Sequence, residues 1–267
     1  MGGFDALEAD ALGAMAAGLD GAVAGQVHAA LECCRVPVAV HVAGRARVGR
    51  RCVAAALGLP PDTVTTPIDA LDRPDPVLDA DVVVYVVAGG PHPADQPPCE
   101  RTLLVRNKVD LCDIRDDGHP MVATLALATA RHEVSTGDFE RFRALARSTD
   151  ATLLLAEPLF RCAESDVDLD ERAVLLERWG FAGVACAVTA LRRDPGLDTA
   201  GLHRTLRSAS GVDPVAVELA NRVDAARARR RVALHADLAA IVARTGCEHV
   251  ERFLESRTLE SRTWAHV

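Results

Sequence analysis

The stretch that decides the fold assignment is Leu103-Leu104-Val105-Arg106-Asn107-Lys108-Val109-Asp110. Its short apolar start predicts a buried strand, and polar groups follow the strand at once. Lys108 is the only lysine of the chain, because every other member of the 30 Lys+Arg is an arginine. With such a bias toward arginine, a lysine falls on this position by accident about once in 30. The lysine therefore indicates a requirement for this side chain.

The four residues Asn107 to Asp110 have the form Asn-Lys-x-Asp, which is the guanine-reading motif of GTP-binding proteins. A carboxylate such as that of Asp110 accepts two hydrogen bonds from the ring N–H and the amino group of guanine, which adenine cannot supply. The Lys108 stem can pack over the base, and arginine is a poor replacement there because its head is planar and bulky. The same four residues are equally compatible with an ordinary turn after a strand.

A second pattern lies upstream, in the order that a nucleotide site requires. Val36 to Ala43 predicts a strand, and Cys52 to Gly58 predicts a short helix. Between them lies the loop Gly44-Arg45-Ala46-Arg47-Val48-Gly49-Arg50-Arg51. A strand, a glycine loop of this length and a helix form the frame of a phosphate-binding loop.

With these two motifs the chain resembles the dynamin-like and Era-like GTPases over roughly residues 36–111. The resemblance implies an α/β fold: a reduced P-loop GTPase-like, mostly parallel sheet with helices, flanked by an N-terminal helix and a C-terminal helical region. It implies a guanine nucleotide, GTP or GDP, as ligand. The nucleotide-binding residues implied by the resemblance are Gly44, Gly49, Arg50, Arg51, Asn107, Lys108 and Asp110.

The loop departs from the family where phosphate chemistry takes place. Arg50 and Arg51 stand where the family has Lys and Ser/Thr, which contact the outer phosphates and Mg²⁺. A guanidinium has no acceptor for a metal and repels Mg²⁺ by its charge. We therefore expect no metal ligands and no Mg²⁺. An arginine-rich surface turn without any ligand is the alternative interpretation of this loop.

The segment between the two motifs lacks the groups that switch loops need. Thr65-Thr66-Pro67-Ile68 stands where the family has Asp-x-x-Gly, so the Asp and the Gly are both replaced. We expect a trimmed switch region, no catalytic residue and hydrolysis that is marginal at best. Ala128-Thr129-Ala130 stands where a loop of the family contacts the base.

Three functions follow as hypotheses. The first is a degenerate GTPase that acts as a regulatory or interaction protein, with an intact GTPase relative or a second copy of itself as partner. The second is a scaffold whose vestigial core binds no nucleotide. The third is a slow, Mg²⁺-dependent GTPase, and we expect that the chain is not an efficient enzyme.

Composition and segment lengths limit the kinds of partner, location and metal site that we expect for this chain. A net charge of −8 argues against nucleic acid as the main partner. No apolar run reaches the ~20 residues of a membrane span, so we expect no transmembrane segment, while peripheral contact with a membrane stays open. No secretory signal is visible, which favours the cytoplasm. The eight cysteines include no Cys-x-x-Cys pair and predict no metal site.

The chain is expected to consist of three segments. Residues 1–35 have helical spacing, and residues 36–135 alternate between strand and helix, with a last strand at Met121 to Leu127. Residues 136–267 are mostly helical and are expected to pack with the N-terminal segment, as the flanking helices of dynamin-like proteins do.

Overall fold

The computed structural model describes residues 6–71, 73–89, 92–93, 95, 100–111, 118–148, 150, 152–162 and 164–264, with the backbone alone for 6–9 and 257–264. Within this part the chain is α/β and divides into two compact units. The continuous unit spans Val40–Leu219, and the discontinuous unit combines Met1–Ala39 with Ala220–Val267. Each unit is described by itself below.

The continuous unit contains a four-stranded parallel sheet in which the strands follow one another in the order β1-β2-β3-β4. The strands are β1 (Val40–Ala43), β2 (Val82–Val87), β3 (Thr102–Asn107) and β4 (His119–Met121). Because all four strands are parallel, their carboxyl ends lie at one edge of the sheet. Ligands of open α/β sheets bind outside that edge.

The sequences of β2 and β3 explain their places in the sheet. Strand β2 consists of five valines and Tyr85, and it is buried at every position except Val87. β-branched side chains suit a strand that is covered on both faces, as parallel strands are. Strand β3 instead alternates, with Leu103, Val105 and Asn107 buried. Its alternation carries a polar side chain, that of Asn107, to a buried position at the end of the strand.

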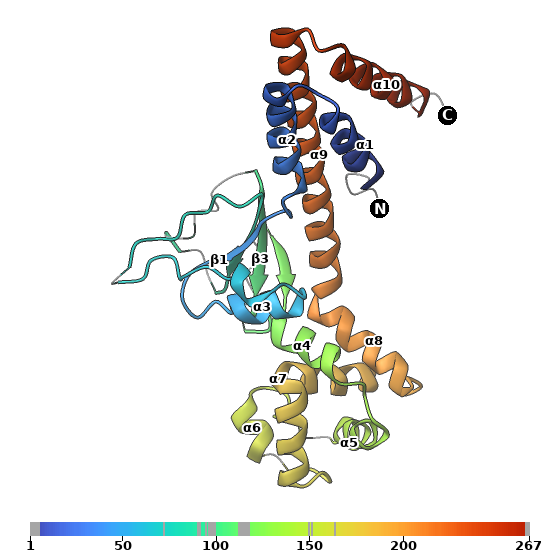
Figure 1. Cartoon of the computed structure of the whole chain (residues 1–267). Coiled ribbons are helices and arrows are strands. Elements are labelled where there is room, and N and C mark those ends of the chain that lie inside the picture. The colour runs from blue at the N-terminus through green and yellow to red at the C-terminus, as the bar shows by residue number, and fades with distance from the viewer. Residues whose placement is uncertain are drawn as a thin grey trace. The chain divides into compact units, whose positions relative to one another are not determined.

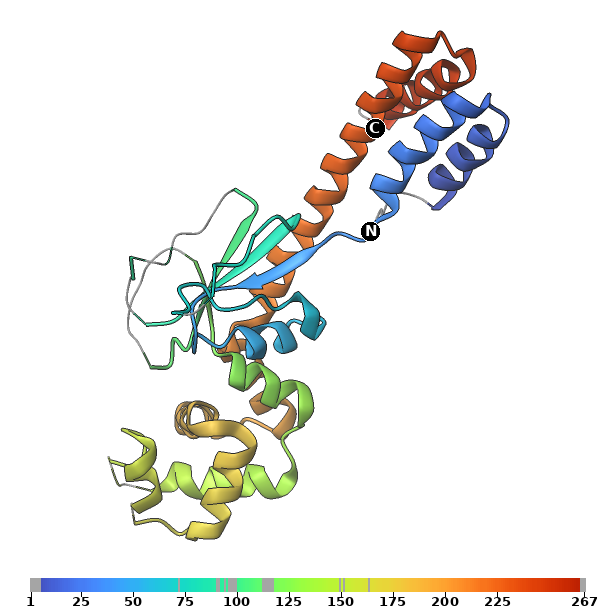
Figure 2. The same ribbon diagram turned by 60° about the vertical axis from the view of Figure 1, so that its left-hand side comes forward.

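Among the described residues, seven helical segments lie wholly within the continuous unit (Figure 2), and α9 begins in it. They are α3 (Arg50–Ala56), the 3-10 segment η1 (Pro61–Thr63), α4 (Ala123–Arg131), α5 (Thr136–Arg147), α6 (Glu157–Cys162), α7 (Leu169–Arg193) and α8 (Thr199–Ser210). Helices α4 to α8 share one core, in which Phe142, Phe160 and Trp179 are fully buried. The side chains of three N-cap residues accept a backbone N–H three positions on: Ser135, Asp168 and Asp198.

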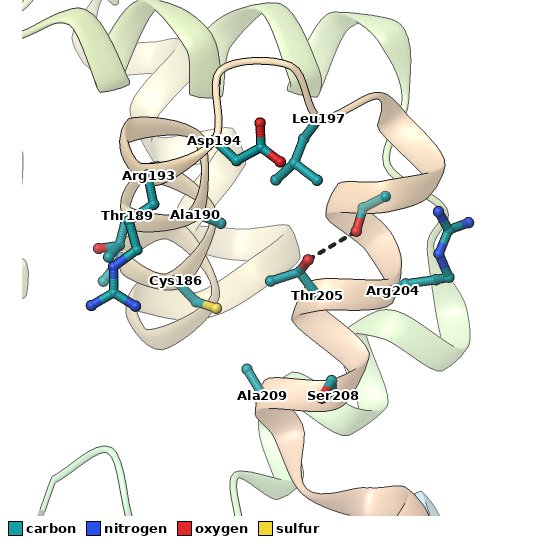
Figure 3. A pocket seen from close by; sticks show the side chains of 12 residues that line it. Cys186, Thr189, Ala190, Arg193, Asp194, Leu197, Arg204, Thr205, Ser208 and Ala209 are labelled. Atoms are coloured by element: carbon teal, nitrogen blue, oxygen red, sulfur yellow. Dashed lines mark hydrogen bonds between the residues drawn. The ribbon is translucent and has the colours of Figure 1, made fainter.

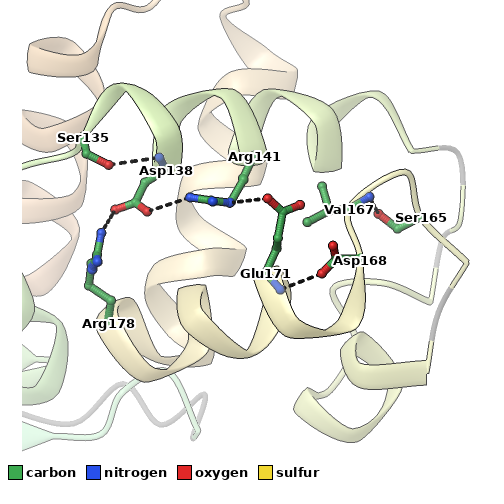
Figure 4. A network of polar contacts seen from close by, with 8 residues as sticks. All are labelled: Ser135, Asp138, Arg141, Ser165, Val167, Asp168, Glu171 and Arg178. Carbon is green, nitrogen blue, oxygen red and sulfur yellow. Dashed lines mark hydrogen bonds and ion pairs between the residues drawn. The ribbon is translucent and has the colours of Figure 1, made fainter.

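A polar network around the buried Asp138 joins α5 to α7 (Figure 4). The carboxylate of Asp138 is fully buried and accepts hydrogen bonds from Arg178 at 2.7 Å and from the indole N–H of Trp179 at 3.2 Å. Arg141 lies 3.6 Å from the same carboxylate and donates to Glu171 at 2.9 Å. A buried carboxylate is stable only with such partners, so the network fixes the register of the two helices.

Helix α7 is the one helix of the described residues that is long and apolar enough to cross a membrane, with a mean hydropathy of 1.5. Its helical geometry breaks at Gly180, where φ is 67° and ψ is 168°. Its face with Leu175, Trp179 and Val188 is buried in the core shared with α5. The core helix of a folded protein passes the same test of length and composition, so this helix is weak evidence for a membrane span.

The discontinuous unit is a helical bundle. Its helices are α1 (Ala6–Ala17), α2 (Gly21–Arg35), the C-terminal part of α9 (Val212–Thr245) and α10 (Glu248–Trp264). Helices α1 and α2 lie beside α9 (Figure 1), and the core between them includes Leu31, Leu238 and Val250. The expected packing of C-terminal helices with the N-terminal segment is therefore present, but it involves only the chain from Ala220 onward. Residues 136–219 belong to the continuous unit with the sheet.

Three expectations about local structure were wrong. The strand predicted from Val36 begins only at Val40, since Val36 still caps α2 and Pro37 has no N–H for a ladder. The run predicted as a last strand, Met121 to Leu127, is the end of β4 followed by α4. Its apolar residues suit a helix face equally well, and alanine favours the helix. Consequently residues 128–130 lie inside α4 and form no loop.

Candidate functional site

The loop after β1 holds two glycines at positions where the backbone tolerates no side chain. At Gly44 φ is 142°, and a Cβ atom would lie 2.3 Å from the carbonyl oxygen of Val86. At Gly49 φ is 93°, and a Cβ atom would lie 2.3 Å from Nδ2 of Asn107. Both predicted glycines thus serve a close approach of the loop to the ends of β2 and β3.

Asn107 connects this loop to the start of α4. Its Nδ2 donates to the carbonyl oxygen of Val48 at 2.9 Å, and its Oδ1 accepts the backbone N–H of Ala123 at 3.0 Å. The side chain is only 5% exposed, so both bonds are made away from water. An amide is suited to this place because it carries a donor and an acceptor on one planar group.

Lys108 holds the same loop from the next position. Its Nζ donates to the carbonyl oxygen of Arg47 at 2.7 Å. Lys108 and Arg47 both adopt the left-handed region, with φ of 62° and 64°. This conformation costs a non-glycine residue about 1–2 kcal/mol. Strain of this kind concentrates at functional sites, where the surrounding structure holds it in place.

Asp110 faces a separate cavity of about 830 Å³ beside the motif. The cavity is also lined by Val122 and Thr124 next to β4 and by Phe181 of α7. The Asp110 side chain is exposed, and within the described residues it makes no hydrogen bond or ion pair. Its carboxylate is therefore accessible for a ligand that offers two donors.

The two arginines at the end of the loop differ in their surroundings. Arg50 donates to the carbonyl oxygen of Thr65, and burial lowers the pKa of its guanidinium, with a smaller contribution from the charge of Arg51. Arginine nevertheless stays protonated at neutral pH. Arg51 is exposed and lines a cavity of about 480 Å³ beside the loop. The two predicted phosphate ligands thus point to one region.

The segment Thr65 to Ile68 lies along β1 and the loop. The N–H of Thr65 donates to the carbonyl oxygen of Val42 at 3.2 Å, and that of Ile68 to Gly44 at 3.1 Å. Isolated parallel bridges join Val42 to Val64 and Arg45 to Ile68. The segment is therefore held to β1 and the loop by single bridges. Thr65, Thr66 and Pro67 of this segment line the 480 Å³ cavity together with residues of the loop.

Two features of the site were not predicted from the sequence. Arg45 forms a two-point ion pair with Asp95, with both N–O distances at 2.9 Å, and this pair raises the pKa of Arg45. Ala123, rather than residues 128–130, is the residue after β4 that meets the Asn-Lys-x-Asp motif. No local pattern marks either one, because each depends on contacts across the fold.

Elsewhere in the continuous unit, a cavity of about 930 Å³ lies between α7 and α8 (Figure 3). Its lining includes Cys186, Arg193 and Arg204, and burial raises the pKa of the Cys186 thiol. The hydroxyl of Thr205 at its wall donates to the carbonyl of Gly201 within α8. Nowhere in the described chain do three or more His, Cys, Asp or Glu side chains gather as metal ligands would.

Comparisons with protein-family models, with curated proteins and with solved structures find no match to this chain.

Proposed function

We propose that this protein binds a guanine nucleotide and acts as a regulatory or interaction protein with little or no hydrolytic activity. The observation that carries the proposal is the Asn107 side chain, which links the glycine loop to the start of α4 through two buried hydrogen bonds. This bond pair brings the loop, the motif after β3 and the turn after β4 together at the carboxyl edge of the sheet. A ligand at that edge would contact all three segments.

In this proposal Asp110 selects the base. Its exposed carboxylate would accept the ring N–H and the amino group of guanine, and the paired contact would reject adenine. Lys108 would cover the base with its stem while its ammonium stays bonded to the carbonyl of Arg47. The apolar part of the 830 Å³ cavity, with Val122 and Phe181, offers room for a planar ring next to the carboxylate.

Hydrolysis is not favoured by the groups around the loop. Arg50 is bonded to the backbone of Thr65, and the Thr65 hydroxyl itself donates to the carbonyl of Thr66 at 2.9 Å. Arg51 has no acceptor for a metal ion. Phosphoryl transfer depends on an ordered water and on neutralisation of the transferred group, and Thr65 and Ile68 stand where the resemblance expects the Asp and Gly that sense that group.

Calorimetric titration of the purified chain with GTP, GDP and ATP, each with Mg²⁺ and with EDTA, tests the proposal. We expect GTP or GDP to bind at least tenfold more tightly than ATP. Asp110→Asn should remove that preference, because a hydrogen bond to a charged group contributes about 1.5–3 kcal/mol. Asp79→Asn is the matched control, since Asp79 is an exposed carboxylate of the same unit. Equal affinity for ATP and GTP would contradict guanine recognition.

A second function, a scaffold without nucleotide, is favoured by one specific observation. Asn107 and Lys108 make their hydrogen bonds within the protein, so a purely structural role also accounts for both side chains. Absence of binding at millimolar nucleotide would favour this scaffold. Mg²⁺-dependent phosphate release that Asp110→Asn abolishes would instead favour a slow GTPase.

A further inference from the structure

The cavity of about 480 Å³ beside the glycine loop has an unusual lining of charge. Four arginines line it, from the loop, from α3 and from the segment beyond η1: Arg47, Arg50, Arg51 and Arg73. Among the described residues no carboxylate lines this cavity. Four like charges around one space repel each other unless an anion lies between them.

Three of these arginines have no side-chain partner among the residues that the structure describes. Within the described chain, the side chains of Arg47, Arg51 and Arg73 make no hydrogen bond or ion pair. Arg50 donates a hydrogen bond to the carbonyl oxygen of Thr65, and its partly buried guanidinium stays charged at neutral pH. Elsewhere in the chain several arginines are neutralised by carboxylates, as in the pairs of Arg45, Arg141, Arg178 and Arg207. The described residues therefore leave the positive charge at this cavity without a carboxylate partner, although the protein as a whole carries −8.

We infer that this cavity is a site for a polyphosphate group that binds without a divalent cation. The inference rests on the proposed nucleotide site and extends it to its phosphate end. Guanidinium groups pair with phosphate oxygens through two parallel hydrogen bonds, so several arginines suit a ligand with several charged oxygens better than a single carboxylate. The nucleotide triphosphate and a free polyphosphate share this chemistry.

The side chains that line the cavity favour arginine, rather than a metal ion, as the partner of the phosphates. Mg²⁺ binds through carboxylate and phosphate oxygens, and the described residues of the cavity lining offer no carboxylate. The Thr65 hydroxyl is already bonded to the carbonyl of Thr66. Arg51 and Arg73 supply positive charge at the wall of the cavity, so a metal ion beside them would be repelled. Added Mg²⁺ should compete for the phosphates and weaken binding.

The test is calorimetric titration of the full chain with inorganic tripolyphosphate in EDTA and in Mg²⁺. We expect binding in EDTA that Mg²⁺ does not strengthen. Arg51→Ala and Arg73→Ala should each weaken it about tenfold to a hundredfold, as the loss of a charge-assisted bond does. Arg131→Ala is the matched control, because Arg131 is exposed on α4 and has no partner among the described residues. Both tested arginines are exposed, so their removal should leave the fold intact, which circular dichroism checks.

The inference is overturned if tripolyphosphate binds only with Mg²⁺, or if both variants bind it as the unchanged chain does. Guanine recognition and the arginine site for polyphosphate can be refuted independently of each other. Tripolyphosphate binding without any preference for GTP over ATP supports the anion site and refutes guanine recognition. Guanine-selective binding that survives both arginine substitutions supports the nucleotide and refutes the arginine site. GTP that binds more tightly than tripolyphosphate identifies the ligand as the nucleotide, and equal affinity identifies free polyphosphate.

Discussion

Removing the Asn107 amide should destabilise the continuous unit by a large part of its stability. In Asn107→Ala the carbonyl of Val48 and the N–H of Ala123 lose their partners at 2.9 and 3.0 Å. Each buried group left without a partner costs about 1–3 kcal/mol, so the expected loss is roughly 2–6 kcal/mol. A domain has only about 5–15 kcal/mol of stability in total.

Asn107→Asp separates the contributions of the two hydrogen bonds, because it removes one of them and keeps the other. The carboxylate keeps an acceptor for the N–H of Ala123, but it places an oxygen against the carbonyl oxygen of Val48, where Nδ2 donated at 2.9 Å. We therefore expect Asn107→Asp to be destabilised by about 1–3 kcal/mol. It should also bind nucleotide more weakly, since the loop loses its anchor.

Urea unfolding followed by tryptophan fluorescence measures both losses. Trp179 is 1% exposed in the core of α4 to α8, and a Trp264→Phe background removes the signal of the other tryptophan, which belongs to the discontinuous unit. Asp79→Asn is the control: Asp79 is exposed in the same continuous unit, and such surface changes stay within about 0.5 kcal/mol. Stabilities of both Asn107 variants within that margin of the parent would refute the role of Asn107 as a link between loop and helix.

Further predictions concern single groups. In the same urea assay, Gly49→Ala should lower the free energy of unfolding by roughly 2–4 kcal/mol, because a side chain there combines a positive φ with a clash. Gly58→Ala, at a φ of 68° with open space around it, should lower it by only about 1–2 kcal/mol. Equal losses for the two variants would contradict the clash at Gly49. Asp138→Asn should cost about 2–3 kcal/mol, since the buried carboxylate accepts from an arginine and a tryptophan, and an unchanged unfolding midpoint would refute that network. Iodoacetamide should alkylate exposed Cys33 before Cys34, because burial raises the pKa of the Cys34 thiol and delays its thiolate; mass spectrometry of the labelled peptides decides the order.

The sequence predictions that the structure confirms are those that rest on a strong local pattern. The apolar start Leu103-Leu104-Val105 is part of strand β3, and the polar motif follows that strand as expected. The glycines at 44 and 49 occupy positive-φ positions, which agrees with a loop that turns sharply between a strand and a helix.

Features that depend on distant parts of the chain could not be predicted in the same way. The partner of Arg45 lies 50 residues away, and Arg73 reaches the loop cavity from a segment with no periodic pattern. The run after β4 was assigned to the wrong element because a short apolar stretch fits both a strand and a helix face. Its true start, at Ala123, meets Asn107 only once the parallel strands are in register.

The division of the chain into one continuous and one interrupted unit has a consequence for its biosynthesis. A ribosome releases α1 and α2 first, yet their partners on α9 and α10 emerge only after the whole of residues 40–219. The sheet unit can therefore fold during synthesis, because domains generally fold as units while translation proceeds. The two first helices meanwhile expose the apolar faces that later pack on α9. During that interval we expect a chaperone to bind these exposed apolar faces. A chain that ends prematurely near residue 219 would lack α10 and most of α9, so the apolar faces of α1 and α2 would stay exposed to solvent.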